Sequence, residues 1–316
     1  MLRSRRTVLS VPGSNPRMLE KAQGLDVDEA FIDLEDAVAA GAKDDARRNA
    51  VAAARDGDWS GKTLGVRVND WSTPWTHRDL IDVVTGAGEH VDTIVLPKAE
   101  TAHHVAATDL LLTQLETALG LDVGRIGLEV QIESARGLLA IDAIATASPR
   151  VEALVFGPAD FMASVNMRSL SVGEQPDGYD VGDAYHHVLM SILVTARAHD
   201  LQAIDGPYLQ VRDVDGFRRS ARRTSALGYD GKWVLHPDQI MIGNDVFTPT
   251  QQDYDAAENI LAAYDRATSA EGGHVGAVML GDEMIDEASR KMALVVAAKG
   301  RAAGLTRSVS SITELC

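Results

Sequence analysis

The chain has 316 residues, of which 45% are hydrophobic and 24% charged, and its formal net charge at pH 7 is −16. This composition is typical of a folded globular protein with a large core and argues against extensive disorder. The excess of acidic groups repels phosphate backbones, which argues against nucleic-acid binding outside a local patch, and an anionic substrate would need cations gathered at its site.

The cysteine content and the N-terminal pattern favour a cytoplasmic protein. The one cysteine, Cys316, leaves no intrachain disulfide and no thiolate metal cluster, as expected in a reducing compartment. Arg3, Arg5 and Arg6 resemble the start of a signal peptide, but the apolar run after them ends at Pro12 and is too short for one. No run reaches transmembrane length, so we expect no membrane partner.

Eight short apolar runs recur along most of the chain. They span residues 7–13, 29–36, 63–69, 93–98, 125–133, 152–160, 202–207 and 231–237. Helix-like stretches separate the runs, and strands that alternate with helices indicate parallel βαβ units. Eight such units are enough to close a barrel. We therefore predict an α/β fold, a (β/α)8 TIM barrel that forms a catalytic domain over residues 1–248.

The segments between the runs have the patterns of packing helices and one long loop. Residues 16–24 follow Ser14 and Asn15, which are plausible N-cap residues, and residues 102–119 carry apolar side chains at helical spacing. Residues 168–183 are rich in glycine and aspartate and show no periodicity, which predicts a loop after the sixth strand. Loops at that face of a barrel commonly carry substrate contacts.

The pattern changes near Pro249. Residues 251–267 are helix-like, a glycine-rich break follows at 271–273, and a second helical pattern begins at Asp286. We predict that residues 249–316 form a C-terminal helical extension that serves as a lid or an oligomerisation arm.

The fifth run shows the alternation of a strand with two different faces. Gly127, Glu129, Gln131 and Glu133 alternate with Leu128, Val130 and Ile132. In a barrel the apolar set would pack outward on the helices and the polar set would line the interior, with Glu133 at the top and Glu129 deeper. The same alternation recurs in residues 66–69. Buried charge is costly unless it is paired or bound to a metal, so inward polar groups favour a site.

Polar residues at the carboxyl ends of the predicted strands would converge on one mouth of the barrel, where active sites lie. These residues are Arg67, Lys98, Glu133, Asp160, Asp205 and His236. Glu133 and Asp160 each close an apolar run, and two carboxylates plus waters suit Mg²⁺. A structural ion pair or a helix N-cap is the alternative for these acids. His236 fits a catalytic base or a hydrogen-bonded structural histidine.

Three basic residues offer positive charge to an anion. Arg67 keeps its proton and so must meet an anion or a developing oxyanion, and the alternative is an internal salt bridge to Glu35 or Asp36. Arg17 and Lys21 follow the turn after the first run and could contact a phosphate near a helix N-terminus. Ordinary solvated side chains are the alternative for both.

Nine short motifs together resemble the citrate lyase β-subunit-like family, and within it the malyl-CoA and β-methylmalyl-CoA lyases. They are VPGSNPRMLEKA (11–22), DLEDAV (33–38), VRVN (66–69), LPKAE (96–100), QIES (131–134), FGPADF (156–161), IDGPY (204–208), GKWVLHPDQI (231–240) and MIDEAS (284–289). Each motif alone is a weak signal. Together they cover nearly the whole chain and are highly specific.

The resemblance implies a TIM barrel with a C-terminal lid, in which Glu133 and Asp160 hold Mg²⁺ or Mn²⁺. It also implies that Arg67 contacts the substrate oxygens and that Asp286 is the catalytic acid/base, delivered by a neighbouring subunit's lid in a homotrimer or homohexamer. By itself, Asp286 has the pattern of an ordinary N-cap. The expected substrate and CoA contacts are Arg17, Lys21, Arg67, Ala159, Asp160, Ile204 and Asp205, supported by Glu35, Asp36 and Lys98.

The reaction that the resemblance implies is reversible cleavage of malyl-CoA, β-methylmalyl-CoA or a related 3-hydroxyacyl-CoA to acetyl-CoA or propionyl-CoA and glyoxylate. A malyl-CoA thioesterase and a non-catalytic assembly subunit of a citrate-lyase-like complex are the alternatives. Two details bear on the site. Asn15 stands where many relatives carry arginine, with Arg17 two positions later. Pro158 has no N–H, so oxyanion donors in that turn must be the amides of Ala159 or Asp160.

Overall fold

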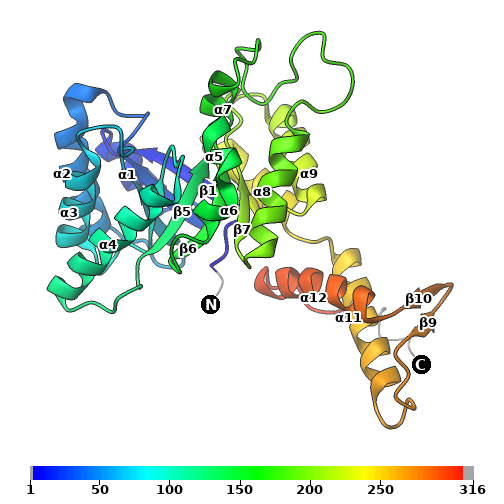
Figure 1. Cartoon of the computed structure of the whole chain (residues 1–316). Helices are drawn as coiled ribbons and strands as arrows, with labels where there is room; N and C mark the ends of the chain where they lie inside the picture. The colour runs from blue at the N-terminus through cyan, green and yellow to red at the C-terminus, as the bar shows by residue number, and fades with distance from the viewer. Residues whose placement is uncertain (1–2, 309–316) are drawn as a thin grey trace. The chain divides into compact units, whose positions relative to one another are not determined.

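A computed structural model describes residues 3–308, and the chain divides into two compact units after Phe247 (Figure 1). Cys316 lies outside the described residues. The first unit contains eight strands. They are β1 (Thr7–Pro12), β2 (Glu29–Asp33), β3 (Thr63–Arg67), β4 (Thr93–Leu96), β5 (Gly127–Ile132), β6 (Val151–Phe156), β7 (Gln202–Asp205) and β8 (Gly231–Val234).

These strands form a closed parallel barrel. Each strand pairs with its neighbour in the chain, and β1 closes the ring by pairing with β8. Each of the eight apolar runs coincides with one strand, although β6 begins one residue before its run, so the predicted (β/α)8 fold is confirmed. The order also follows from chain connectivity, because each parallel pair needs a crossover that returns the chain to the same end of the barrel.

Helices fill the crossovers, as the sequence pattern predicts. They are α1 (Pro16–Gln23), η1 (Ala40–Ala42), α2 (Lys43–Asp56), α3 (Thr76–Ala87), α4 (Ala102–Leu119), α5 (Ala135–Leu139), α6 (Ile141–Ala145), α7 (Pro158–Ser164), α8 (His186–Ala198), α9 (Val214–Leu227) and α10 (Pro237–Phe247). Asn15 caps α1, since its side chain accepts from the Met18 N–H. Residues 165–185 contain no helix or strand, which confirms the loop prediction.

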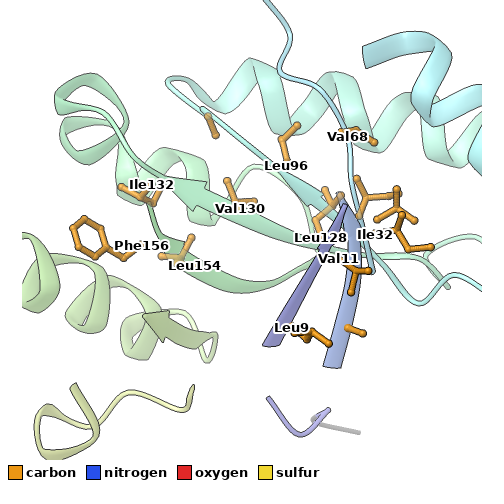
Figure 2. Close-up of a cluster of buried hydrophobic side chains, with 14 of the residues drawn as sticks. Leu9, Val11, Ile32, Val68, Leu96, Leu128, Val130, Ile132, Leu154 and Phe156 are labelled. Atoms are coloured by element: carbon orange, nitrogen blue, oxygen red, sulfur yellow. The ribbon is translucent and has the colours of Figure 1, made fainter. Parts of the chain in front are cut away.

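The two faces of each strand pack into different cores. Apolar residues on the outward faces of the strands meet the surrounding helices, and Leu128, Val130 and Ile132 of β5 belong to this outer core (Figure 2). A smaller cluster contains only strand residues and therefore fills the barrel interior. Its members are Val8, Phe31, Val95, Ala153, Val155, Ile204 and Trp233. The outward assignment of the apolar set on β5 is thus confirmed.

A charged layer lies in the barrel near the N-terminal ends of the strands. Arg5 is 2% exposed, and its guanidinium contacts Glu29 at 2.7 Å, Glu129 at 3.3 Å and Glu152 at 2.7 Å. Burial and the Glu129 charge raise the pKa of Glu29 well above its usual value. This places Glu129 deep in the interior, as the alternation along β5 predicts.

The second unit pairs two helices with a hairpin. It contains α11 (Gln251–Thr268), β9 (Val278–Leu280), β10 (Glu283–Ile285) and α12 (Glu287–Ala302). The two helices confirm the helical patterns predicted for this part of the chain, but the hairpin was not predicted. Its two-residue turn is Gly281-Asp282, with Gly281 at φ 60°. Such turns favour glycine because they need positive φ. Among residues 3–308, no helix is both long and apolar enough to cross a membrane.

Candidate active site at the barrel mouth

A buried arginine lies at the end of β3. Asp33, at the end of β2, holds the Arg67 guanidinium through two hydrogen bonds, Nε to Oδ1 at 2.8 Å and Nη2 to Oδ2 at 2.6 Å. Glu35 Oε2 lies 3.1 Å from Nη1. The rings of Phe31 and Trp233 lie 5.8 and 5.4 Å from the guanidinium carbon and form the wall below it. The side chain is therefore fixed before any ligand arrives.

Electrostatics keeps this arginine charged. Burial opposes the charge on Arg67, but the Asp33 carboxylate outweighs it and raises the pKa of the guanidinium. Burial likewise acts against the Asp33 carboxylate, and Arg67 lowers the pKa of Asp33 below its usual value. A salt bridge from Arg67 to Glu35, which the sequence offered as the alternative to a ligand contact, is present, whereas the bidentate partner Asp33 was not named from the sequence.

Glu133 lies directly after β5 and is 3% exposed. The Lys98 backbone N–H donates to its Oε1 at 2.6 Å, and the Gln131 side-chain amide donates to its Oε2 at 3.1 Å. Burial and the charge of Glu35 raise the pKa of Glu133 to about 8. The charge of Arg67 acts in the opposite direction but does not outweigh burial and the neighbouring acids, and a bound cation would add the positive charge that stabilises the Glu133 carboxylate.

Lys98 connects the acids of the mouth. It follows β4 with a φ of 49°, a conformation uncommon for a residue with a side chain, and this turns its N–H toward Glu133. Its ammonium group pairs closely with Glu35, lies 3.2 Å from Asp36 Oδ1 and lies 3.9 Å from Asp160 Oδ1. Burial opposes the charge, but the hydrogen bond to Glu35 raises the pKa of Lys98.

Asp160 reaches the mouth from a helix. The sequence analysis placed it at the end of the sixth strand, which was wrong, because β6 ends at Phe156 and Pro158 starts α7. Proline is well suited to the first helical turn and cannot continue a central strand. Burial raises the pKa of Asp160 even though Lys98 acts in the opposite direction, and the Asp160 charge adds to the raised pKa of Glu133.

Gly157 lets the two acidic segments meet. A Cβ at this position would lie 2.2 Å from Glu133 Oε2 and 2.4 Å from the Glu133 Cβ, distances that real side chains do not show. The chain between β6 and α7 therefore passes directly over Glu133, and only glycine allows this approach. The motif that contains Asp160 thus also shapes the space around Glu133.

The donor set of the mouth fits a divalent cation. Five carboxylates and two cationic groups gather here, namely Asp33, Glu35, Asp36, Glu133 and Asp160 with Arg67 and Lys98. Asp33 is matched by Arg67, whereas Glu133 and Asp160 have raised pKa values. Within residues 3–308, no group of three or more His, Cys, Asp or Glu is arranged as a metal site. Two carboxylates with waters match the usual coordination of Mg²⁺.

The remaining predicted contacts lie in different surroundings. Arg17 and Lys21 are exposed on α1, and Ala159 is exposed in the first turn of α7. Ile204 belongs to the interior cluster of the barrel. Asp205 is buried, and its Oδ2 lies 2.6 Å from the Lys232 ammonium, so its side chain is engaged in an internal ion pair.

Two other predicted residues are helix-terminal. His236 is half-buried after the end of β8, where its Nδ1 lies 3.4 Å from Asp238 Oδ2. Asp286 belongs to the C-terminal unit and caps α12, because its Oδ1 accepts from the backbone N–H groups of Ala288 and Ser289 at 2.9 and 3.1 Å. The hydrogen bond from the Ser289 backbone lowers the pKa of Asp286. These interactions all fall on Oδ1.

The sequence contained a signal for the partner of Arg67 that it did not name. Asp33 lies two residues before Glu35, just as Gln131, which already belonged to the predicted inward set, lies two residues before Glu133. Because side chains two positions apart point the same way, the inward set could have been extended to Asp33. The positive φ of Lys98 left no such signal, since lysine is not a residue that marks left-handed backbone.

Comparison with known proteins now adds to this geometry. Residues 6–237 match the family model described as HpcH/HpaI aldolase/citrate lyase. The chain belongs to this family. The resemblance drawn from the nine motifs is thereby confirmed, and the matched residues cover all eight strands of the barrel.

Relatives match almost the whole chain. L-malyl-CoA/beta-methylmalyl-CoA lyase of Rhodobacter capsulatus is 38% identical over 302 residues, which are 93% of this chain and 94% of the relative. Citrate lyase subunit beta of Leuconostoc mesenteroides subsp. cremoris is 33% identical over 90% of this chain and 89% of its own. Mycobacterium tuberculosis CitE, solved with magnesium, acetoacetate and coenzyme A, has a TM-score of 0.72 at 26% identity, covering 93% of this chain and 97% of that one.

Proposed function

We propose that this protein is a magnesium-dependent lyase that reversibly cleaves malyl-CoA or β-methylmalyl-CoA to acetyl-CoA or propionyl-CoA and glyoxylate. One observation carries the proposal. Lys98 links the two acids, because its backbone N–H donates to Glu133 at 2.6 Å and its ammonium group lies 3.9 Å from Asp160, and Gln131 contacts both Glu133 and the Arg67 guanidinium. The name and full-length match of the Rhodobacter capsulatus relative support the choice of substrate. The single cysteine favours the cytoplasm as the site of the reaction.

Glu133 and Asp160 would hold the metal ion. Mg²⁺ prefers oxygen ligands and keeps several waters, so two carboxylates leave positions for a chelating 2-oxoacid, and Mn²⁺ suits the same ligands. When bound, the ion supplies Lewis-acid stabilisation of negative charge on the glyoxylate oxygens. CitE of Mycobacterium tuberculosis was solved with magnesium, which supports the same metal here.

Arg67 would stabilise the oxygen that becomes negative during the reaction. Asp33 occupies its Nε and one N–H of Nη2, which leaves the second N–H of Nη2 as a donor for a substrate oxygen. A guanidinium already fixed by Asp33 loses little freedom when the enolate or alkoxide forms. Lys98 acts as a positioning residue, because its backbone N–H and ammonium group hold Glu133 and Glu35.

Asp286 would remove the α-proton of the CoA thioester in the condensation direction. The lowered pKa of Asp286 keeps it ionised at neutral pH, and Oδ2 remains available to accept a proton because the cap uses Oδ1. A neighbouring subunit of a homotrimer or homohexamer would deliver it as part of the C-terminal unit. Closure of this lid would exclude water from the enolate.

Contacts to the CoA part of the substrate would come from the rim of the barrel. Arg17 and Lys21 are exposed on α1 and would contact phosphates. The amide of Ala159 in the first turn of α7 would face the acyl oxygen. At Ile204 and Asp205, side chains are committed to the interior, so a contact there would use the backbone.

The test is a product analysis. Purified protein is incubated with acetyl-CoA, glyoxylate and MgCl2, and the thioester product is identified by mass, with propionyl-CoA in a parallel reaction. The proposal expects malyl-CoA and β-methylmalyl-CoA, loss of both on chelation, and a rate at least roughly 10- to 100-fold lower in Glu133→Gln. A parallel reaction starts from malyl-CoA, for which the lyase gives acetyl-CoA and glyoxylate, whereas malate with free CoA would instead indicate a thioesterase. Absence of any reaction on free CoA thioesters would favour an assembly subunit.

A further inference from the structure

A buried lysine lies behind the segment that holds Arg67. Lys43 begins α2 and is 7% exposed. Its Nζ donates to the backbone carbonyl oxygens of Leu34 at 2.8 Å and of Glu35 at 2.7 Å. The centroid of the Trp75 ring lies 5.4 Å from the same Nζ. Lysine is almost never fully buried unless it is paired, and the proposed reaction gives this ammonium group no part, so its place in the fold needs its own explanation.

The hydrogen-bond partners of Lys43 are unusual for a buried cation. A buried charge is commonly matched by an opposite charge, whereas both of these hydrogen bonds go to neutral peptide oxygens. Burial lowers the pKa of Lys43, and the charges of Asp33 and Glu35 act in the opposite direction. Lys43 therefore fixes the course of the backbone at residues 34–35, and its charge acts on the acids of the mouth.

The backbone held in this way forms a turn around the Asp33 carboxylate. Asp33 Oδ1 accepts from the Glu35 N–H at 2.8 Å, and its Oδ2 accepts from the Ala37 N–H at 3.2 Å. The Leu34 N–H donates to the backbone carbonyl oxygen of Arg67 at 2.9 Å. Both oxygens of Asp33 also accept from the Arg67 guanidinium. A shift of the turn would therefore move the carboxylate that aligns the arginine.

The same turn carries the Glu35 side chain toward the proposed metal ligands. Glu35 is 4% exposed, and its Oε2 lies 3.1 Å from Arg67 Nη1. Its Oε1 pairs closely with the Lys98 ammonium group, and the Lys98 backbone N–H donates to Glu133. A continuous series of hydrogen bonds and ion pairs thus connects Lys43 to the arginine and to one of the two acids.

We propose that Lys43 is a positioning residue of the active site: by holding the turn, it keeps the Arg67 guanidinium aligned on Asp33. The role rests on the proposed function, in which Arg67 faces a substrate oxygen. An ammonium group has three N–H donors and can serve two neighbouring carbonyl oxygens at once. Without it, the buried peptide oxygens would lose this donor, and the turn would rearrange to find another. A guanidinium that loses its alignment stabilises charge on the substrate less well.

Titration calorimetry of glyoxylate binding to the Mg²⁺-loaded full chain tests this role, without a CoA thioester so that no reaction occurs. Lys43→Met retains the bulk of the side chain but has no donor, and it should raise the Kd for glyoxylate roughly tenfold or more. The number of sites per chain should stay at the parent value, whereas a mere loss of folded protein would lower that number and leave Kd unchanged. Lys43→Arg keeps the charge and the N–H donors and should bind glyoxylate more tightly than Lys43→Met. If Lys43→Met does not fold, Lys43→Gln, which keeps an amide donor, takes its place.

Arg150→Met is the matched control. Arg150 is a buried cation, 4% exposed, that lies just before β6 at the end of the barrel opposite the mouth. Its Nη2 lies 2.6 Å from Glu116 Oε2. The variant should lower the melting temperature, because it leaves a buried acid without its partner, but it should leave the Kd for glyoxylate unchanged.

Crystal structures of the parent chain and of Lys43→Met test the geometry directly. The proposal expects the two hydrogen bonds between Arg67 and Asp33, 2.8 and 2.6 Å long in the parent chain, to be lengthened or broken in the variant. Unchanged hydrogen bonds would overturn it even if Kd rises, because only the charge of Lys43 would then act. An unchanged Kd in Lys43→Met would overturn it as well. Absence of lyase activity in the parent chain would refute the proposed function alone, and the crystal structures would still decide the role of Lys43.

Discussion

A fall in pH from 8 to 6 should weaken Mg²⁺ binding at the barrel mouth by roughly fiftyfold, because a carboxylate must lose its proton before it can ligate a metal. Burial and the charge of Glu35 raise the pKa of Glu133 to about 8. Below that pH the ion must displace a proton, so the apparent affinity drops about tenfold for each pH unit. Above it, the affinity should level off.

Calorimetric titration of Mg²⁺ between pH 6 and 9, in buffers of different ionisation enthalpy, measures both the affinity and the protons released. At pH 7 we expect roughly 0.9 proton per ion, the fraction of Glu133 that is still protonated. Glu133→Gln should abolish both the release and the slope, whereas Glu89→Gln should change neither, because Glu89 is an exposed acid beyond the C-terminal end of α3. An affinity that is flat from pH 6 to 8, or an unchanged slope in Glu133→Gln, would refute the reasoning.

The same shift acts on the stability of the metal-free protein. The folded-state pKa of Glu133 lies above the ordinary value of 4.5, so the protonated form contributes stability in full below pH 4.5 and loses it as the pH rises through about 8. Mg²⁺ binds the ionised form. The ion should therefore raise the melting temperature more at pH 8.5 than at pH 6.

Three further predictions concern the N-cap of α12, the close approach of Gly157 to Glu133 and the buried charges inside the barrel. Asp286→Asn should abolish turnover but keep the cap, whereas Asp286→Ala should also cost about 1 kcal/mol of stability, as rate assays and thermal melts would show. Gly157→Ala should displace Glu133, abolish Mg²⁺ binding in calorimetry and lower the free energy of unfolding by about 1–3 kcal/mol. In urea unfolding, Glu129→Gln should change the free energy of unfolding little. Arg5→Ala should lower it by about 3–5 kcal/mol, because it leaves buried acids without their positive partner.

Each of these has a result that would contradict it. Full turnover in Asp286→Asn would show that Asp286 is not the catalytic acid/base. Normal Mg²⁺ affinity in Gly157→Ala would show that the chain can move aside, and Gly41→Ala is its control because nothing lies within 4 Å of the added methyl group. Equal losses of stability in Glu129→Gln and Arg5→Ala would mean that both interior acids need their charge.

The barrel was predictable because its signals are local and repeated. Each strand lies in a short apolar run, and the alternation along β5 separates Leu128, which packs outward, from Glu129, which lies inside. The hairpin of the C-terminal unit escaped prediction because its strands have only three residues each and are half exposed. A periodic signal cannot build up over so short a segment, and only the Gly281 turn pointed to it.

The site was predictable in its residue types but not in its pairings. Strand ends brought Arg67 and Glu133 to one mouth, as parallel topology requires. The spacing of two residues places Asp33 on the same side as Glu35, but its bidentate contact with Arg67 depends on side-chain geometry that no spacing encodes. Asp160 was misplaced because the run was extended through Gly157 and Pro158, although this dipeptide marks the change from strand to helix.

The most direct test of the account is a crystal of the protein grown with Mn²⁺ and glyoxylate, with the ion located by its anomalous scattering. The account predicts one ion ligated by a carboxylate oxygen of Glu133 and one of Asp160, with glyoxylate beside the Arg67 guanidinium. An ion that contacts only one of these acids, or that lies elsewhere on the chain, would contradict it.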